Sequence, residues 1–158
     1  MVIRVALNRR SLEDAAQQLE TAIEELHQKE QEICVRLAER GAFRAQMDYA
    51  RVPFERNDVV VTTEETGHGA KIIASGEVVL FLEFGAGARL GYGHPDPHGY
   101  GPGTFPGKGH WDDPKGWWIP KEHGGGHTYG NAPAMGMYNA AQEIRARAKT
   151  EAEEVLRT

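Results

Sequence analysis

The chain has 158 residues, a length that suits one domain. Hydrophobic residues make up 40% of it and charged residues 26%, which excludes a membrane-embedded chain and a wholly disordered one. Its one cysteine, Cys34, excludes an internal disulfide and a multi-cysteine zinc site, and suits a reducing compartment. The formal net charge of −5 disfavours a broad nucleic-acid-binding surface, because phosphate contacts need clustered Lys and Arg.

The first part of the chain predicts a short strand and then a long helix. Apolar residues alternate with others over residues 2–7, as in a half-buried strand. Ser11, with Asp14 three residues later, resembles a capping box at the start of a helix. An apolar seam follows at alternating four- and three-residue steps, formed by Leu12, Ala16, Leu19, Ile23, Leu26, Ile33 and Leu37. We expect a helix over residues 12–40 that ends at Gly41.

This helix would be about 44 Å long at 1.5 Å per residue, which is longer than a small sheet. Part of its seam should therefore meet another chain or the second helix. The heptad-like spacing also fits a coiled coil, but four heptads that end at a glycine are more typical of a helix lying on a sheet.

The middle of the chain carries a β signal. Residues 59–63, 70–74 and 77–84 are three runs rich in β-branched or apolar residues, separated by turn sequences that contain glycine. Val78, Leu80, Leu82 and Phe84 would share one face of the third run. Turns this short predict an antiparallel meander of three strands.

Residues 84–133 have a different composition. They hold fourteen of the 19 glycines, seven of the eight prolines and all three tryptophans. Gly and Pro break helices and strands, so we expect mostly irregular structure here. The segment is too rich in aromatic residues for a disordered linker, so it should pack on the domain or on a partner.

The chain ends in a helical pattern over residues 134–156, with Pro133 at or just before its first turn. Together these elements predict one α+β domain over residues 1–158. A mainly antiparallel sheet of about four strands would be packed by the long N-terminal helix and the C-terminal helix. A long Gly- and aromatic-rich loop would be inserted over residues 85–132.

The loop histidines are weak candidates for a metal site, because imidazoles bind Zn²⁺ or Ni²⁺. The candidates are His94, His98, His123 and His127. His123 and His127 are four residues apart, but the three glycines between them will not hold a helix, so we expect no metal and no cofactor. Cys34 is better explained as a small core residue than as a nucleophile, and no nucleophile or phosphate-loop motif is found.

Several stretches resemble the siphophage tail-completion, or head–tail joining, family. These are Phe81-Leu82-Glu83-Phe84-Gly85-Ala86-Gly87, Asn131-Ala132-Pro133-Ala134-Met135, Gly101-Pro102-Gly103-Thr104-Phe105-Pro106-Gly107, His110-Trp111 and Gly116-Trp117-Trp118. The similarity covers essentially the whole chain, although many family members carry Arg-Pro-Phe where this chain has Ala132-Pro133-Ala134.

The resemblance implies a non-enzymatic virion protein that acts as a ring subunit in head–tail joining or tail completion. It implies no cofactor, other neck or tail proteins as partners, DNA passing nearby without sequence-specific binding, and no membrane. The protein would be found in the virion, and in the bacterial host cytoplasm during assembly. The residues that we expect to contact partners are Glu83, Phe84, Trp111, Trp117, Trp118 and Tyr129.

An alternative from another class stays open. The His- and Trp-rich loop could instead belong to a metal-dependent hydrolase or to a cell-wall-binding module, with the tryptophans as a sugar-stacking platform.

Overall fold

The computed structural model describes residues 8–53, 57–96 and 113–157. In chain order they form helix α1 (Arg9–Ala50), strands β1 (Val60–Thr66) and β2 (Gly69–Ser75), and the short helix α2 (Val79–Phe84). Strand β3 (Trp117–Trp118), the 3-10 helix η2 (Lys121–His123), strand β4 (His127–Thr128) and helix α3 (Gly136–Arg157) follow. The α+β class is confirmed. The four strands form two antiparallel pairs, β1–β2 and β3–β4, rather than one sheet. The strand expected over residues 2–7 lies outside the described residues.

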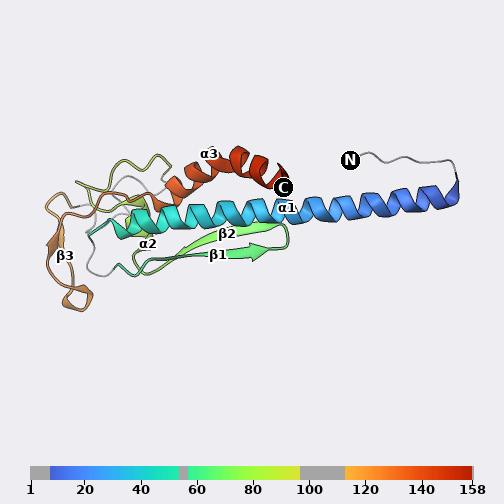
Figure 1. Cartoon of the computed structure of the whole chain (residues 1–158). Coiled ribbons are helices and arrows are strands. Elements are labelled where there is room, and N and C mark those ends of the chain that lie inside the picture. Colours follow the sequence, from blue (N-terminus) through green and yellow to red (C-terminus); the bar gives the residue numbers. More distant parts are fainter. Residues whose placement is uncertain (1–7, 54–56, 97–112, 158) are drawn as a thin grey trace.

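Helix α1 is the central rod of the molecule, with the β1–β2 hairpin on one side and α3 on another (Figure 1). Helix α3 runs antiparallel to it. Asn139, near the start of α3, donates a hydrogen bond to Asp48 near the end of α1 at 2.8 Å. Glu151, near the end of α3, pairs with Arg40 at 2.5 Å. These buried carboxylates fix α3 along the second half of α1.

The first half of α1 extends beyond both of these neighbours (Figure 1). The tip of the β1–β2 hairpin reaches α1 at Gln31, whose side-chain amide donates to the carbonyl of Gly69 at 3.0 Å. We therefore divide the helix into an arm, Arg9–Glu30, and a packed half, Gln31–Ala50. With 42 residues, the whole helix is about 63 Å long.

Two details of α1 differ from the prediction. The N-cap is Asn8, whose side-chain oxygen accepts from the Ser11 N–H at 3.0 Å, so the capping box at Ser11 is wrong. Gly41 does not end the helix but lies buried inside it. A Cβ on Gly41 would lie 2.6 Å from Ile72 Cδ1 and 2.8 Å from Ile144 Cδ1. The bare backbone of Gly41 thus leaves room for the ends of two isoleucine side chains, one from the hairpin and one from α3.

The third predicted strand is also wrong, because its last six residues form α2. The carboxylate of Asp58 accepts from the backbone N–H groups of Glu77 and Val78 at 2.6 and 3.3 Å, at the start of this helix. Helical geometry turns Leu82 and Glu83 inward and leaves Leu80 39% exposed. The alternation that predicted a strand therefore does not correspond to the buried face.

The core lies where the packed half of α1, the base of the β1–β2 hairpin, α2 and α3 meet. Its fully buried members are Ala45, Tyr49, Val59, Leu82 and Ala140. Just after α2, Ala86 and Asn131 exchange backbone hydrogen bonds at 2.9 and 3.0 Å. This bridge joins the two ends of the Gly- and aromatic-rich segment next to the core.

Candidate assembly site

Glu83 lies at the centre of a buried hydrogen-bond cluster. Its side chain accepts from the Tyr49 hydroxyl at 2.7 Å and from the backbone N–H groups of Met137 and Tyr138 at 2.9 and 3.0 Å. Tyr49 and Met137 share the Oε2 oxygen, and His94 Nε2 lies 3.3 Å from Oε1, which also accepts from Tyr138. The residue is only 6% exposed, and a buried carboxylate is tolerated only when it is this well hydrogen-bonded. Glu83, expected to contact a partner, thus contacts four residues of its own chain.

The sequence around α3 explains why this helix needs Glu83. Met135 directly precedes the helix, and its carbonyl accepts the first intrahelical bond from Asn139 at 2.8 Å. A methionine side chain has no oxygen with which to cap the free N–H groups of the first turn. Glu83 supplies that acceptor from α2, and its negative charge also suits the positive end of the helix dipole.

The ring of Tyr49 packs against Gly136 on its way to Glu83, and only glycine leaves room for the ring there. A Cβ on Gly136 would lie 2.7 Å from the Tyr49 ring, so the bare backbone at the start of α3 makes room for the ring. Burial of Tyr49 and the neighbouring Glu83 carboxylate raise the pKa of its hydroxyl well above the ordinary range. The hydroxyl is therefore a permanent donor to Glu83 at physiological pH.

The aromatic surroundings of this cluster include Phe84, another predicted contact residue. The His94 ring lies 4.8 Å from the Phe84 ring and 5.5 Å from the Tyr138 ring, measured between centroids. Phe84 is half-buried. His94, a weak metal candidate, thus fixes the start of the Gly- and aromatic-rich segment to Glu83.

The β3–β4 hairpin presents the other described aromatic residues on two faces. Trp117 pairs with Thr128 and Trp118 pairs with His127, so neighbouring side chains point to opposite faces. Trp117 is buried, whereas Trp118 is 74% exposed. One tryptophan therefore anchors the hairpin, and the other is available for contact.

The exposed face of this hairpin carries a row of rings. The His127 ring lies between those of Trp118 and Tyr129, at centroid distances of 5.3 and 5.0 Å, and meets both edge-on. The Arg89 guanidinium lies 4.4 Å from the centroid of the Tyr129 ring. We call Trp118, His127, Tyr129 and Arg89 the ring face. A solvent-exposed row of this kind suits binding to another molecule.

The remaining residues that were predicted to contact a partner or to bind a metal form no further cluster within the described parts of the chain. Trp111 and His98 lie outside the described residues, and His123 is exposed in η2. Within residues 8–53, 57–96 and 113–157, no group of three or more His, Cys, Asp or Glu side chains could hold a metal ion. The described histidines belong instead to the Glu83 cluster, to the ring face and to the exposed surface.

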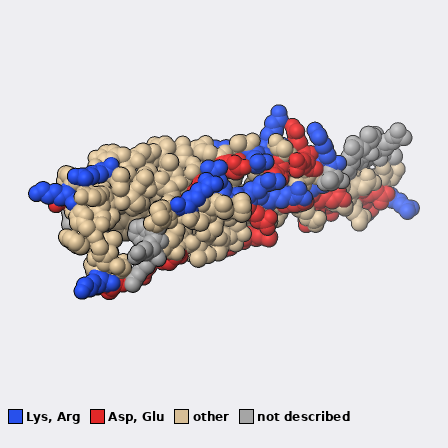
Figure 2. Space-filling view, turned by 60° about the vertical axis from the view of Figure 1, so that its left-hand side comes forward, with Lys and Arg blue, Asp and Glu red and all other residues tan. Residues whose placement is uncertain are grey.

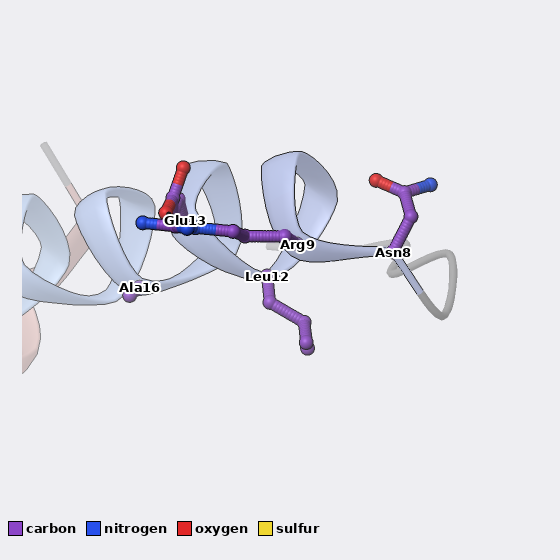
Figure 3. Close-up of a pocket in the computed structure, with 5 residues that line it drawn as sticks. All are labelled: Asn8, Arg9, Leu12, Glu13 and Ala16. Carbon is purple, nitrogen blue, oxygen red and sulfur yellow. Dashed lines mark hydrogen bonds and ion pairs between the residues drawn. The ribbon is translucent and has the colours of Figure 1, made fainter.

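The arm is a second exposed surface, and no arm residue is among the predicted contact residues. Its seam residues Leu12, Leu19, Ile23 and Leu26 are all more than half exposed. Figure 3 shows an open depression at the start of the arm, where Leu12 and Ala16 point to one side of the helix and Glu13 to another. The length of the helix and the regular heptad spacing were the signals that could have added these residues.

Comparison of the chain with protein families, with curated proteins and with solved structures found no match. Among the described helices, none is long and apolar enough to cross a membrane.

Proposed function

We propose that this chain is a non-enzymatic structural protein of a tailed phage or prophage, acting in head–tail joining or tail completion as a ring subunit. It works in the virion and is assembled in the bacterial host cytoplasm, without a cofactor. The observation that carries the proposal is the arm. A helix that projects from its own domain with an uncovered row of leucines and isoleucine is suited to hold another subunit.

The size of this uncovered surface supports a subunit that assembles only with its partners. Full burial of a large apolar side chain contributes about 1.5–3 kcal/mol. The four seam residues are half buried already, so covering them contributes about 4 kcal/mol per chain. That is at the low end of the roughly 4–15 kcal/mol that association costs. One arm contact alone therefore gives a weak complex, and a closed ring with several contacts gives a strong one.

The rest of the domain supports the same function. Buried carboxylates fix α3 to α1 and to α2, so the arm projects from a rigid base. The motifs around Glu83 and in the loop are those that resemble the head–tail joining family.

The test is disruption of the gene in a host that carries the prophage, followed by induction and electron microscopy of the particles. We expect filled capsids and free tails in place of joined particles, and rescue by the unaltered gene supplied on a plasmid. Normal infectious particles after disruption contradict the proposal. Flanking portal, capsid and tail-tube genes would support it independently.

A second candidate, a cell-wall-binding module, is favoured by one observation, the exposed rings of Trp118 and Tyr129. Aromatic faces of this kind stack on sugars. Co-sedimentation with purified peptidoglycan that is lost in Trp118→Ala, together with joined particles after gene disruption, would favour this second function.

A further inference from the structure

We propose that the arm of one copy docks its seam on the ring face of the next copy. This inference rests on the proposed function and names the contact that builds the assembly. The two surfaces lie at opposite ends of the molecule, because the arm extends past the tip of the β1–β2 hairpin while β3–β4 lies beyond the other end of α1 (Figure 1). One chain therefore cannot make the contact with itself.

Charge disfavours the simplest other occupant, the arm of a second copy. Residues 9–30 carry six carboxylates and three Lys or Arg side chains, and residues 13–25 carry five carboxylates with neither Lys nor Arg. Two arms placed side by side would repel each other. In a parallel pair, Glu30 falls on the seam and would meet the same residue of its partner.

The two edges of the seam differ in a way that fits the ring face. Glu13 and Glu20 follow Leu12 and Leu19 directly and occupy one edge. Ala22 occupies the other edge, where its small side chain allows a partner to come close, whereas Ala15, one heptad earlier, is already buried.

The ring face offers the complementary chemistry. The Trp118, His127 and Tyr129 rings provide an exposed apolar row for leucine side chains, and Arg89 lies at one end of that row. The same segment also exposes Lys115 and Lys121, together with the carboxylates of Asp113 and Glu122, so Arg89 is the cation on which the contact depends. Figure 2 shows Lys and Arg side chains at the margins of this end of the molecule, and acidic and basic side chains side by side along the opposite half. In the proposed contact the glutamate edge of the arm meets Arg89, and the leucines meet the rings.

A contact between two different surfaces has a geometric consequence. A docked pair still offers one free arm and one free ring face, so the contact repeats from copy to copy. Repetition with a closing rotation gives a ring, as the proposed function requires.

The test uses the full chain with p-benzoylphenylalanine in place of Leu19, mixed with ¹⁵N-labelled chain at concentrations up to about 1 mM, since a single contact is weak. After irradiation, mass spectrometry identifies adducts that join one labelled and one unlabelled chain. We expect the adducts to fall within residues 117–129 and at Arg89. Adducts confined to the arm of the second copy overturn the proposal, as does the absence of any intermolecular adduct.

Charge reversal provides the matched control. Arg89→Glu should lower the adduct yield at least tenfold, and adding Glu20→Arg should restore it, while adding Asp14→Arg, on the side of the helix opposite the seam, should not. Trp118→Ala should also lower the yield, and an unchanged yield overturns the contact. Arm–arm adducts would leave the role in the particle intact, because gene disruption measures that role separately.

Discussion

The two halves of α1 differ both in sequence pattern and in surroundings, because the next two seam positions after Leu37 are Arg40 and Arg44. In the packed half, Gly41, Ala42 and Ala45 are buried against the hairpin and α3. In the arm, the leucines and the isoleucine of the seam are more than half exposed. The seam of the arm is thus left for another molecule, whereas the packed half buries a different face, which includes the large Tyr49. Periodicity shows which face of a helix is apolar, and only the positions of the neighbouring elements show whether the chain covers it.

The largest expected effect is on the packed side of this comparison, at Glu83. Glu83→Ala leaves the Tyr49 hydroxyl and two backbone N–H groups of α3 without their acceptor. We expect a loss of about 3 kcal/mol or more in the free energy of unfolding, measured by urea denaturation. Glu83→Gln keeps one acceptor oxygen and should lose about half as much. Equal stability of the alanine variant and the unaltered chain would show that the cluster contributes nothing.

A smaller loss is expected at Gly136. Gly136→Ala places a methyl group against the Tyr49 ring and forces either the ring or the start of α3 to move. Overpacking of this kind costs about 1–3 kcal/mol, and thermal denaturation should show it. Gly67→Ala is the matched control, because nothing lies within 4 Å of the position of its Cβ. A comparable loss in the control would mean that the Tyr49 contact is not the cause.

The third effect depends on pH. Burial and Glu83 raise the pKa of Tyr49, so its contribution to stability is complete below the ordinary tyrosine pKa of about 10. Above that pH the unfolded chain loses the proton while the folded chain keeps it, and stability falls. Tyr49→Phe should cost about 1 kcal/mol at neutral pH and weaken the decline between pH 9 and 11, as followed by urea midpoints. An alkaline decline identical in both proteins would contradict this assignment.

The smallest effect on stability is expected in the arm. Ile23→Ser should change the free energy of unfolding by less than about 0.5 kcal/mol, because the side chain is already exposed. The same change should abolish assembly, measured by sedimentation at high concentration. Gln17→Ser, on the polar side of the helix, is the control for both measurements. A large loss of stability in Ile23→Ser would mean that the arm is part of the folded core.

Sequence reasoning predicted the two long helices, the β1–β2 hairpin and the α+β class, because each rests on a periodic pattern over many residues. It failed where contacts between residues far apart in the sequence determine the local structure. The start of α2 depends on Asp58, about twenty residues away, and the local alternation of apolar residues could not reveal that capping. Glycine is typical of a helix end, but Gly41 lies inside α1, where it leaves room for the side chains of Ile72 and Ile144.

The candidate site was predicted in part for similar reasons. Trp118 and Tyr129 stood out by residue type, and both are exposed. The role of Glu83 could not be predicted, because its backbone donors lie more than fifty residues later in the chain. The helix was predicted to outreach the sheet, with part of its seam meeting another chain or the second helix, but which residues form the arm depends on where the hairpin and α3 end, and no local pattern gives that.

The Ala86–Asn131 bridge has a consequence for how the sequence of this chain can change during evolution. Two backbone hydrogen bonds hold the neck of a 44-residue excursion beside the core. A longer excursion costs little more to close, since each doubling of length adds only about 0.6 kcal/mol. Lineages can therefore lengthen, shorten or exchange the excursion while the scaffold stays constant, and so adapt one scaffold to different neighbours.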